Sequence, residues 1–154
     1  MILPTYEAYL YLYPGILLPQ PLLNFSVLLS LSQIMKVTIT SIELKGPFKF
    51  FALSYRAMNI LRQLKATNCR AMKKKGIWIK HYTMTLWDSE QDLKEFATSG
   101  PHLDAMKASR EIAKEIRTIT YDADSLPDWK TAEALLEKGH IIRYESQAST
   151  NPIS

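Results

Sequence analysis

Few side chains in this sequence have the types and spacing needed for metal or nucleotide chemistry. The three histidines, His81, His102 and His140, lack the spacing that holds a structural metal ion. Cys69 is the single cysteine, which excludes an intrachain disulfide and a cysteine-based zinc site. Neither common phosphate-binding loop, G-x-G-x-x-G or G-x-x-x-x-G-K-[ST], occurs. The function must therefore be inferred from the fold and from the residues that could line a ligand pocket.

A short basic and aromatic stretch partly matches an RNA-binding signature. Residues Lys75–Tyr82 (KGIWIKHY) follow the pattern [KR]-G-[FY]-[GA]-F-V-x-[FY] of RNA-recognition domains only in part. Ile77 and Ile79 stand where two stacking aromatic rings are needed, and the expected first strand (VTITSI) has none. Base stacking supplies much of the affinity for single-stranded RNA. We therefore do not expect nucleic acid as a partner.

The stretch from Thr85 to Met106 (TLWDSEQDLKEFATSGPHLDAM) carries a more informative arrangement. A strand ends in Trp87, a helix starts at DSE, Phe96 follows nine residues after the tryptophan, and SGPH opens the next helix. This arrangement resembles the antibiotic-biosynthesis-monooxygenase-like family of dimeric α+β barrels, over about residues 35–125. Trp87 matches the strand-end tryptophan of that family, and His102 matches its helix histidine.

The resemblance implies a homodimer of two sheets packed face to face, with a pocket between each sheet and its helices. Some members oxidise electron-rich aromatic substrates with O₂ and no cofactor, some bind and degrade haem, and many have no known reaction. Cofactor-free oxidation needs a base, a donor for a developing oxyanion and a dry aromatic cavity. On this resemblance we expect a small-molecule-binding domain similar to a cofactor-independent monooxygenase, acting on an aromatic or phenolic substrate.

Side chains are available for each of these roles. His102 is the expected base, because an unperturbed imidazole titrates near neutral pH. Trp87 and Asn59 complete the expected catalytic set, with Trp87 as cavity wall and Asn59 as the hydrogen-bond donor, a role that Tyr82 or Tyr55 could also fill. The expected substrate-binding residues are Tyr55, Tyr82, Met84 and Phe51. We expect no metal ligands.

Each of these residues also has a simpler structural explanation. Trp87 at a strand end is typical of a core residue, because an indole buries a large apolar area. His102 near a helix start can be satisfied by a backbone carbonyl group. His81 on the third expected strand suits a packed or dimer-facing position, and Tyr55 suits helix packing.

Two other functions stay open beside the monooxygenase-like one. The same fold serves non-catalytic ligand-binding or interaction modules, since fold does not fix function. Haem is the one cofactor that we keep as an alternative, with His102 or His81 as the iron ligand.

The elements that must position these residues follow from hydrophobic periodicity. Strands are predicted over residues 37–44, 69–72, 77–87 and 116–122, and helices over 50–66, 89–98, 101–115 and 129–137. We expect a hairpin turn at Lys73–Gly76, and helix caps at Asp88 and Asp128. The order β-α-β-β-α-β predicts an α+β, ferredoxin-like unit with an appended C-terminal helix. Its open sheet face predicts a homodimer.

Charge divides the chain unevenly. Residues 36–80 carry eleven Lys and Arg against one acid, Glu43, a net charge of +10 that favours an acidic or phenolic ligand. We expect an apolar N-terminal extension over 1–34 outside the core, a domain over 35–145 and a flexible tail over 146–154. Prolines interrupt the first segment, and it lacks a basic start, so we expect neither a membrane partner nor secretion. The expected location is the cytoplasm.

Overall fold

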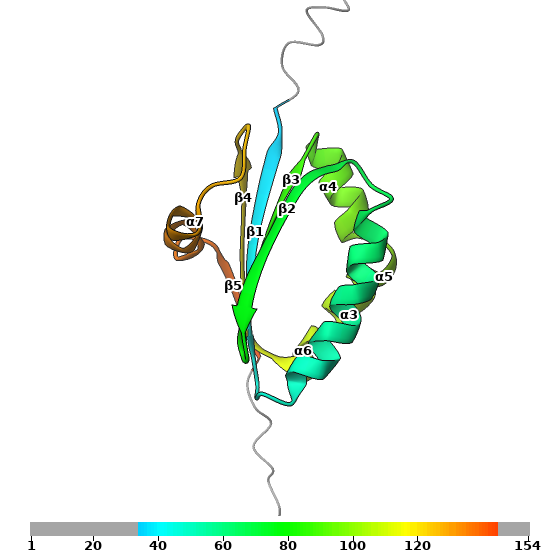
Figure 1. Cartoon of the computed structure of the whole chain (residues 1–154), viewed down its shortest axis with the longest axis vertical. Coiled ribbons are helices and arrows are strands. Elements are labelled where there is room, and N and C mark those ends of the chain that lie inside the picture. Colours follow the sequence, from blue (N-terminus) through cyan, green and yellow to red (C-terminus); the bar gives the residue numbers. More distant parts are fainter. Residues whose placement is uncertain (1–33, 145–154) are drawn as a thin grey trace, which may run out of the picture. The chain divides into compact units, whose positions relative to one another are not determined.

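The computed structural model describes residues 34–144 (Figure 1). The predicted N-terminal extension, apart from Ile34, and the predicted tail lie outside the described residues. The helices are α3 (Lys49–Leu64), α4 (Glu90–Ala97), α5 (Gly100–Lys107), α6 (Ser109–Ile112) and α7 (Trp129–Leu136). The strands are β1 (Lys36–Leu44), β2 (Cys69–Ile77), β3 (Lys80–Trp87), β4 (Ala113–Asp122) and β5 (His140–Arg143).

The five strands form one antiparallel sheet in the order β2-β3-β1-β4-β5. β1 lies at the centre, where Thr40 pairs with Thr83 of β3 on one side and with Thr118 of β4 on the other. The predicted α+β, ferredoxin-like class is confirmed, and the appended helix is α7. Within the described residues, no helix has the length and apolar character needed to cross a membrane.

The two faces of the sheet are covered by different helices (Figure 1). Side chains alternate along β1, so Val37 and Ile39 point to one face, where they are fully buried. Ala132 and Leu136 of α7 join their core cluster. α3, α4 and α5 lie on the opposite side of the sheet. α7 therefore covers part of the face that the sequence prediction left to a second subunit.

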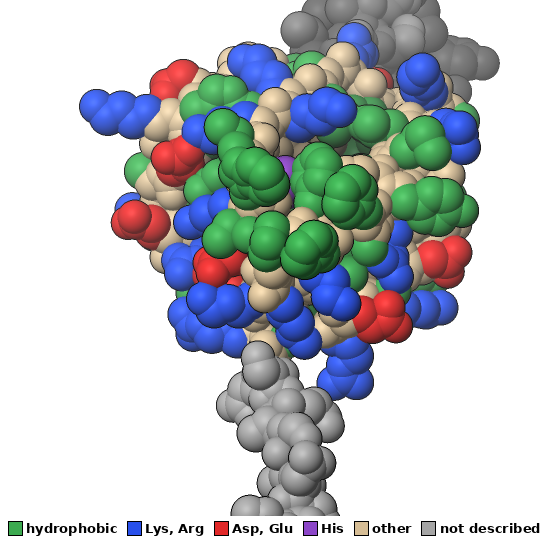
Figure 2. Space-filling model, turned by 60° about the horizontal axis from the view of Figure 1, so that its bottom comes forward, with side chains coloured by type: hydrophobic (Ala, Val, Ile, Leu, Met, Phe, Trp, Pro, Cys, Tyr) green, Lys and Arg blue, Asp and Glu red, His purple; other side chains and the backbone are tan. Residues whose placement is uncertain are grey.

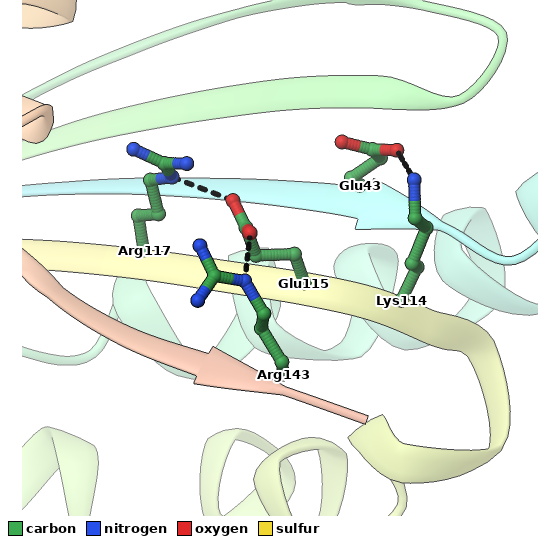
Figure 3. A network of polar contacts seen from close by, with 5 residues as sticks. All are labelled: Glu43, Lys114, Glu115, Arg117 and Arg143. Carbon is green, nitrogen blue, oxygen red and sulfur yellow. Dashed lines mark hydrogen bonds and ion pairs between the residues drawn. The ribbon is translucent and has the colours of Figure 1, made fainter. Parts of the chain in front are cut away.

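Beyond α7, the same face is charged rather than apolar. The Glu115 carboxylate accepts hydrogen bonds from Arg117 and Arg143, and Glu43 pairs with Lys114 (Figure 3). The hydrogen bond from Arg117, with a further one from Arg143, lowers the pKa of the Glu115 carboxyl below its usual value. This end of the face is built from ion pairs.

The predicted hairpin turn at Lys73–Gly76 is wrong, because β2 continues through it to Ile77. The turn is Trp78–Ile79, between the paired residues Ile77 and Lys80. Lys75 explains the difference: its ammonium lies over the rings of Tyr82 and Trp129 and pairs with Glu133. Because its side chain packs on a face of the sheet, Lys75 is part of a strand rather than of a turn.

Three further boundaries differ from the prediction. Ser89, not Asp88, caps α4, since its hydroxyl accepts the backbone N–H of Asp92. The helix predicted over 101–115 stops at Lys107, and after the single turn of α6 the strand begins at Ala113 instead of residue 116. The fifth strand, β5, was not predicted.

Candidate functional site

A cavity of about 530 Å³ lies between the sheet and α3. This volume is within the range of small-molecule sites. Its lining residues come from β1, α3, β2 and β3: Thr40, Ile42, Phe50, Leu53, Ser54, Ala57, Met58, Leu61, Lys74, Lys75, Gly76, His81, Tyr82 and Thr83. The apolar ones come mainly from α3 (Phe50, Leu53, Ala57, Met58 and Leu61), and hydroxyl, imidazole and ammonium groups make up much of the rest.

Thr40 and Thr83, which line the sheet side of the cavity together with Ile42, belong to a larger layer of threonine side chains. Thr38, Thr40, Thr83, Thr85, Thr118 and Thr120 occupy alternate, paired positions of the three central strands. The Thr40 and Thr118 hydroxyls are 3.3 Å apart, and those of Thr38 and Thr120 are 3.0 Å apart. α3 contributes an apolar wall opposite them. An amphipathic ligand would therefore place its apolar surface on α3 and its polar groups on the sheet.

His81 is the one imidazole among the lining residues. Its ring stacks on Phe50, with centroids 5.5 Å apart, and its Nε2 lies 3.0 Å from the Trp78 carbonyl oxygen. Because a carbonyl only accepts, Nε2 carries a proton, which leaves Nδ1 as the acceptor of the neutral ring. Gly76 is required beside it, since a Cβ there would lie 2.5 Å from His81 Nδ1.

Lys74 supplies positive charge to the cavity. It is exposed, and no ion pair among residues 34–144 includes it. Lys75, in contrast, is held by Glu133 and the two aromatic rings on the α7 face. A free ammonium group beside an apolar cavity favours an anionic or phenolic ligand.

Four residues were predicted to bind substrate, and only one of them lines the cavity. Tyr82 is a lining residue, although its ring packs against Trp129 of α7. Met84 is fully buried in the core on the α7 face. Phe51 and Tyr55 lie on α3 with mostly exposed side chains.

The residues predicted to be catalytic lie outside the lining of the cavity. Trp87 packs against Phe96, and Phe96 against His102, with ring centroids 4.9 and 4.6 Å apart. Asn59 lies on α3, where its side-chain oxygen accepts a hydrogen bond from Arg62. The catalytic role of these three residues stays a prediction.

His102 is tied to its surroundings by backbone contacts. Its Nδ1 lies 3.2 Å from the Ala97 carbonyl oxygen, and its backbone N–H donates to Gln63 at 2.8 Å. Burial lowers the pKa of His102 below the ordinary histidine value, opposed by the contact with the Ala97 carbonyl. These contacts match the structural role considered for His102 in the sequence.

The alternation of polar and apolar residues along the strands could have indicated the lining residues, although no motif of the sequence pointed to them. Thr40 and Thr83 are polar residues that alternate with apolar ones along their strands, and Phe50 shares the helical stripe of Leu53 and Ala57. His81 was considered only as a packing residue or an alternative haem ligand. Polar residues that alternate on neighbouring strands indicate a solvent-filled or ligand-filled face rather than a dry core.

The fold and this cavity define a ferredoxin-like α+β domain with a small-molecule-sized cavity between its sheet and a helix. Within residues 34–144, no group of three or more His, Cys, Asp or Glu is placed to hold a metal ion. Neither a protein-family model nor a curated protein matches the sequence.

Solved structures do match. Protein SO0527 from Shewanella oneidensis is similar at 12% identity and a TM-score of 0.54, over 60% of this chain and 93% of that one. A Bacteroides thetaiotaomicron protein described as a "possible oxidoreductase" matches at 10% identity and a TM-score of 0.50, over 60% and 100%. SnoaB, a cofactor-independent oxygenase from Streptomyces nogalater, is also a neighbour at 12% identity and a TM-score of 0.46, over 62% and 99%. At these identities the similarities to the Shewanella and Bacteroides proteins show the fold alone.

Proposed function

We propose that this domain binds a small aromatic or phenolic molecule in the cavity between the sheet and α3. The observation that carries the proposal is His81, the imidazole that lines a cavity of about 530 Å³ and whose Nε2 is held by the Trp78 carbonyl, which leaves Nδ1, beside Gly76, as the nitrogen that can accept a proton. Rings fit against Phe50 and Leu53, and a phenolic oxygen fits near the threonine hydroxyls and Lys74.

The chemistry that we propose begins with a proton transfer. The phenol gives its proton to Nδ1 of His81, and the resulting phenolate is stabilised by the Lys74 ammonium. The electron-rich phenolate then reacts with O₂. One oxygen atom enters the ring to give a quinone, the other leaves as water, and the substrate supplies all four electrons. No cofactor is needed for this balance.

Binding is tested with 1-naphthol as the probe. Replacing the lining residue Ala57 with phenylalanine fills the cavity, and replacing His81 with alanine removes the base. We expect Ala57→Phe to raise the dissociation constant about tenfold or more, since roughly 1.4 kcal/mol of lost contact is tenfold. The measurement is a fluorescence or calorimetric titration of the full chain. Ala66→Phe, at an exposed position after α3, is the matched control and should bind as the wild type does.

Oxygen uptake, measured beside the naphthol titration, separates the roles of the two histidines. His81→Ala should abolish oxygen uptake, measured with an electrode, while His102→Ala leaves both uptake and naphthol binding unchanged. Loss of uptake in His102→Ala alone would contradict the assignment to His81 and favour the set His102, Trp87 and Asn59. Naphthol binding without oxygen uptake in the wild type would leave a non-catalytic binding module, and a Soret shift on haem addition lost in His81→Ala would favour a haem protein.

A homodimer is part of the proposal. The ion pairs of Glu43, Glu115 and Arg117 lie on the sheet face beyond α7, and a two-fold axis there would bring acidic and basic groups of two copies together (Figure 3). Sedimentation velocity at micromolar concentration is expected to show a dimer that Arg117→Glu weakens. A monomer at every concentration would contradict this. We also propose a cytoplasmic location, in keeping with the single free cysteine, Cys69.

A further inference from the structure

An exposed apolar surface, which we name the aromatic tip, lies where α3 begins and the β2–β3 hairpin turns. It consists of Phe48, Phe51, Ile77, Trp78 and Ile79. Phe48 is 85% exposed, Ile77 76% and Trp78 71%. Figure 2 shows hydrophobic side chains gathered at this end of the domain, with mostly basic and some acidic side chains around them. The stack of His81 on Phe50 and the contact of His81 with the Trp78 carbonyl join the two segments.

Trp78 occupies a backbone conformation that tryptophan disfavours. Its φ is 57°, in the left-handed region, and it is the first of the two loop residues between Ile77 and Lys80. Glycine is the usual residue in a two-residue hairpin loop with a positive φ at this position. The side chain of Trp78 is mostly exposed, so burial inside the domain does not offset the strain. A strained, exposed indole indicates a contact outside the chain.

The segment of the chain that carries the aromatic tip has charge of one sign. Residues 44–87 contain ten Lys and Arg and no Asp or Glu. Lys49 follows Phe48 directly, and Lys80 closes the hairpin loop. Among the described residues, no ion pair includes Lys49 or Lys80. The tip therefore combines apolar side chains with the free ammonium group of Lys49, while the Lys80 ammonium lies over the Tyr82 ring, 5.7 Å from its centroid.

We propose that the aromatic tip docks on an anionic membrane surface. Tryptophan and phenylalanine side chains enter the interface between headgroups and acyl chains, while lysines meet the anionic headgroups. A second copy fits less well, because a symmetric contact would bring lysines against lysines. Single-stranded nucleic acid could stack on the rings of Phe48, Phe51 and Trp78, but it fits less well, since the aliphatic Ile77 and Ile79 give a base no ring to stack on and suit a lipid interface instead.

This proposal departs from the sequence-based expectation of no membrane partner, which concerned insertion of the N-terminal segment. It rests on the aromatic tip and not on the proposed function. The two sites adjoin, because Phe50 and His81 line the cavity and also join the two segments of the tip. Docking would place the cavity beside the lipid surface, where apolar molecules concentrate.

The test is co-sedimentation of the full chain with vesicles of phosphatidylcholine, with or without phosphatidylserine. We expect binding to the phosphatidylserine vesicles that weakens with salt. The double variant Lys49→Glu, Lys80→Glu should lower the partition coefficient about tenfold or more. Lys130→Glu, at an exposed position on α7, is the charge control and should have a smaller effect. Trp78→Gly should also lose binding, with a urea midpoint no lower than that of the wild type, because glycine relieves the φ strain.

Three outcomes would overturn the proposal. Vesicle binding that is unchanged by the tip variants would assign it to another part of the chain. Loss of poly-U binding in these variants, with no vesicle binding by the wild type, would make the tip a nucleic-acid surface. A shift from dimer to monomer in Trp78→Gly, again without vesicle binding, would make it an interface between copies. Met106→Ala, an exposed apolar residue on α5, serves as the control throughout.

Discussion

Replacing Ala132 with glutamate is expected to destabilise the domain by about 3 kcal/mol or more, the scale of a buried and unpaired charge. Ala132 is 1% exposed and belongs to the core cluster of Val37, Ile39 and Leu136. The glutamate would either lose its hydration or push α7 off the sheet. Urea unfolding followed by circular dichroism measures the change.

Ala134 provides the matched control for this substitution. It lies two residues further along α7 and is exposed, so Ala134→Glu should change the free energy of unfolding by no more than about 0.5 kcal/mol. Equal effects of the two variants would mean that α7 is not part of the folded core. The sheet face would then be free for a second subunit, as the sequence prediction had it.

Trp87→Ala is expected to cost about 3–5 kcal/mol, the range for large-to-small changes in a core. Trp87 is fully buried against Leu64 and Phe96, and its indole N–H donates to the Thr85 hydroxyl at 2.9 Å. The variant leaves a cavity and removes that donor. The change is measured by urea unfolding, as for Ala132.

Trp78→Ala removes the same ring from an exposed position and is the control for Trp87→Ala. It should leave the free energy of unfolding within about 0.5 kcal/mol of the wild type. If Trp87→Ala proved equally mild but abolished naphthol binding, Trp87 would act in the site rather than in the core.

Hydrophobic periodicity correctly predicted the elements in which buried and exposed side chains follow a regular pattern. Burial alternates along β1 from Lys36 to Ile42, α3 carries an apolar stripe, and the Asp128 side chain caps α7 by accepting the backbone N–H of Thr131. β5 has only four residues after a helix end and is held by its pairing with β4, so no local pattern indicates it. The Lys73–Gly76 error has the same origin, because the partners of Lys75 are distant in sequence.

The candidate site was harder to predict than the fold. Alternation along β3 puts His81 and Thr83 on the face toward α3, and helical spacing puts Phe50 and Ala57 on the opposing wall. The width of the cavity, however, depends on how the side chains of the two walls pack against each other, and these residues are distant in sequence. The motif from Trp87 to His102, in contrast, lies close in sequence and packs into a neighbouring cluster.

In many small domains one core both stabilises the fold and surrounds the ligand. Here the threonine layer separates the residues that stabilise the fold from those that line the cavity. The tightly packed apolar residues lie beyond the sheet, under α7, and around Trp87 at one end of the helix layer. Apart from Leu61 and Tyr82, the residues that line the cavity belong to neither of these two clusters. Residues such as Ser54, Ala57 and Met58 are therefore free to change in size or polarity while the scaffold stays folded. We therefore expect substitutions in this architecture to change ligand preference more readily than the free energy of unfolding. Directed evolution of new binding should begin on α3.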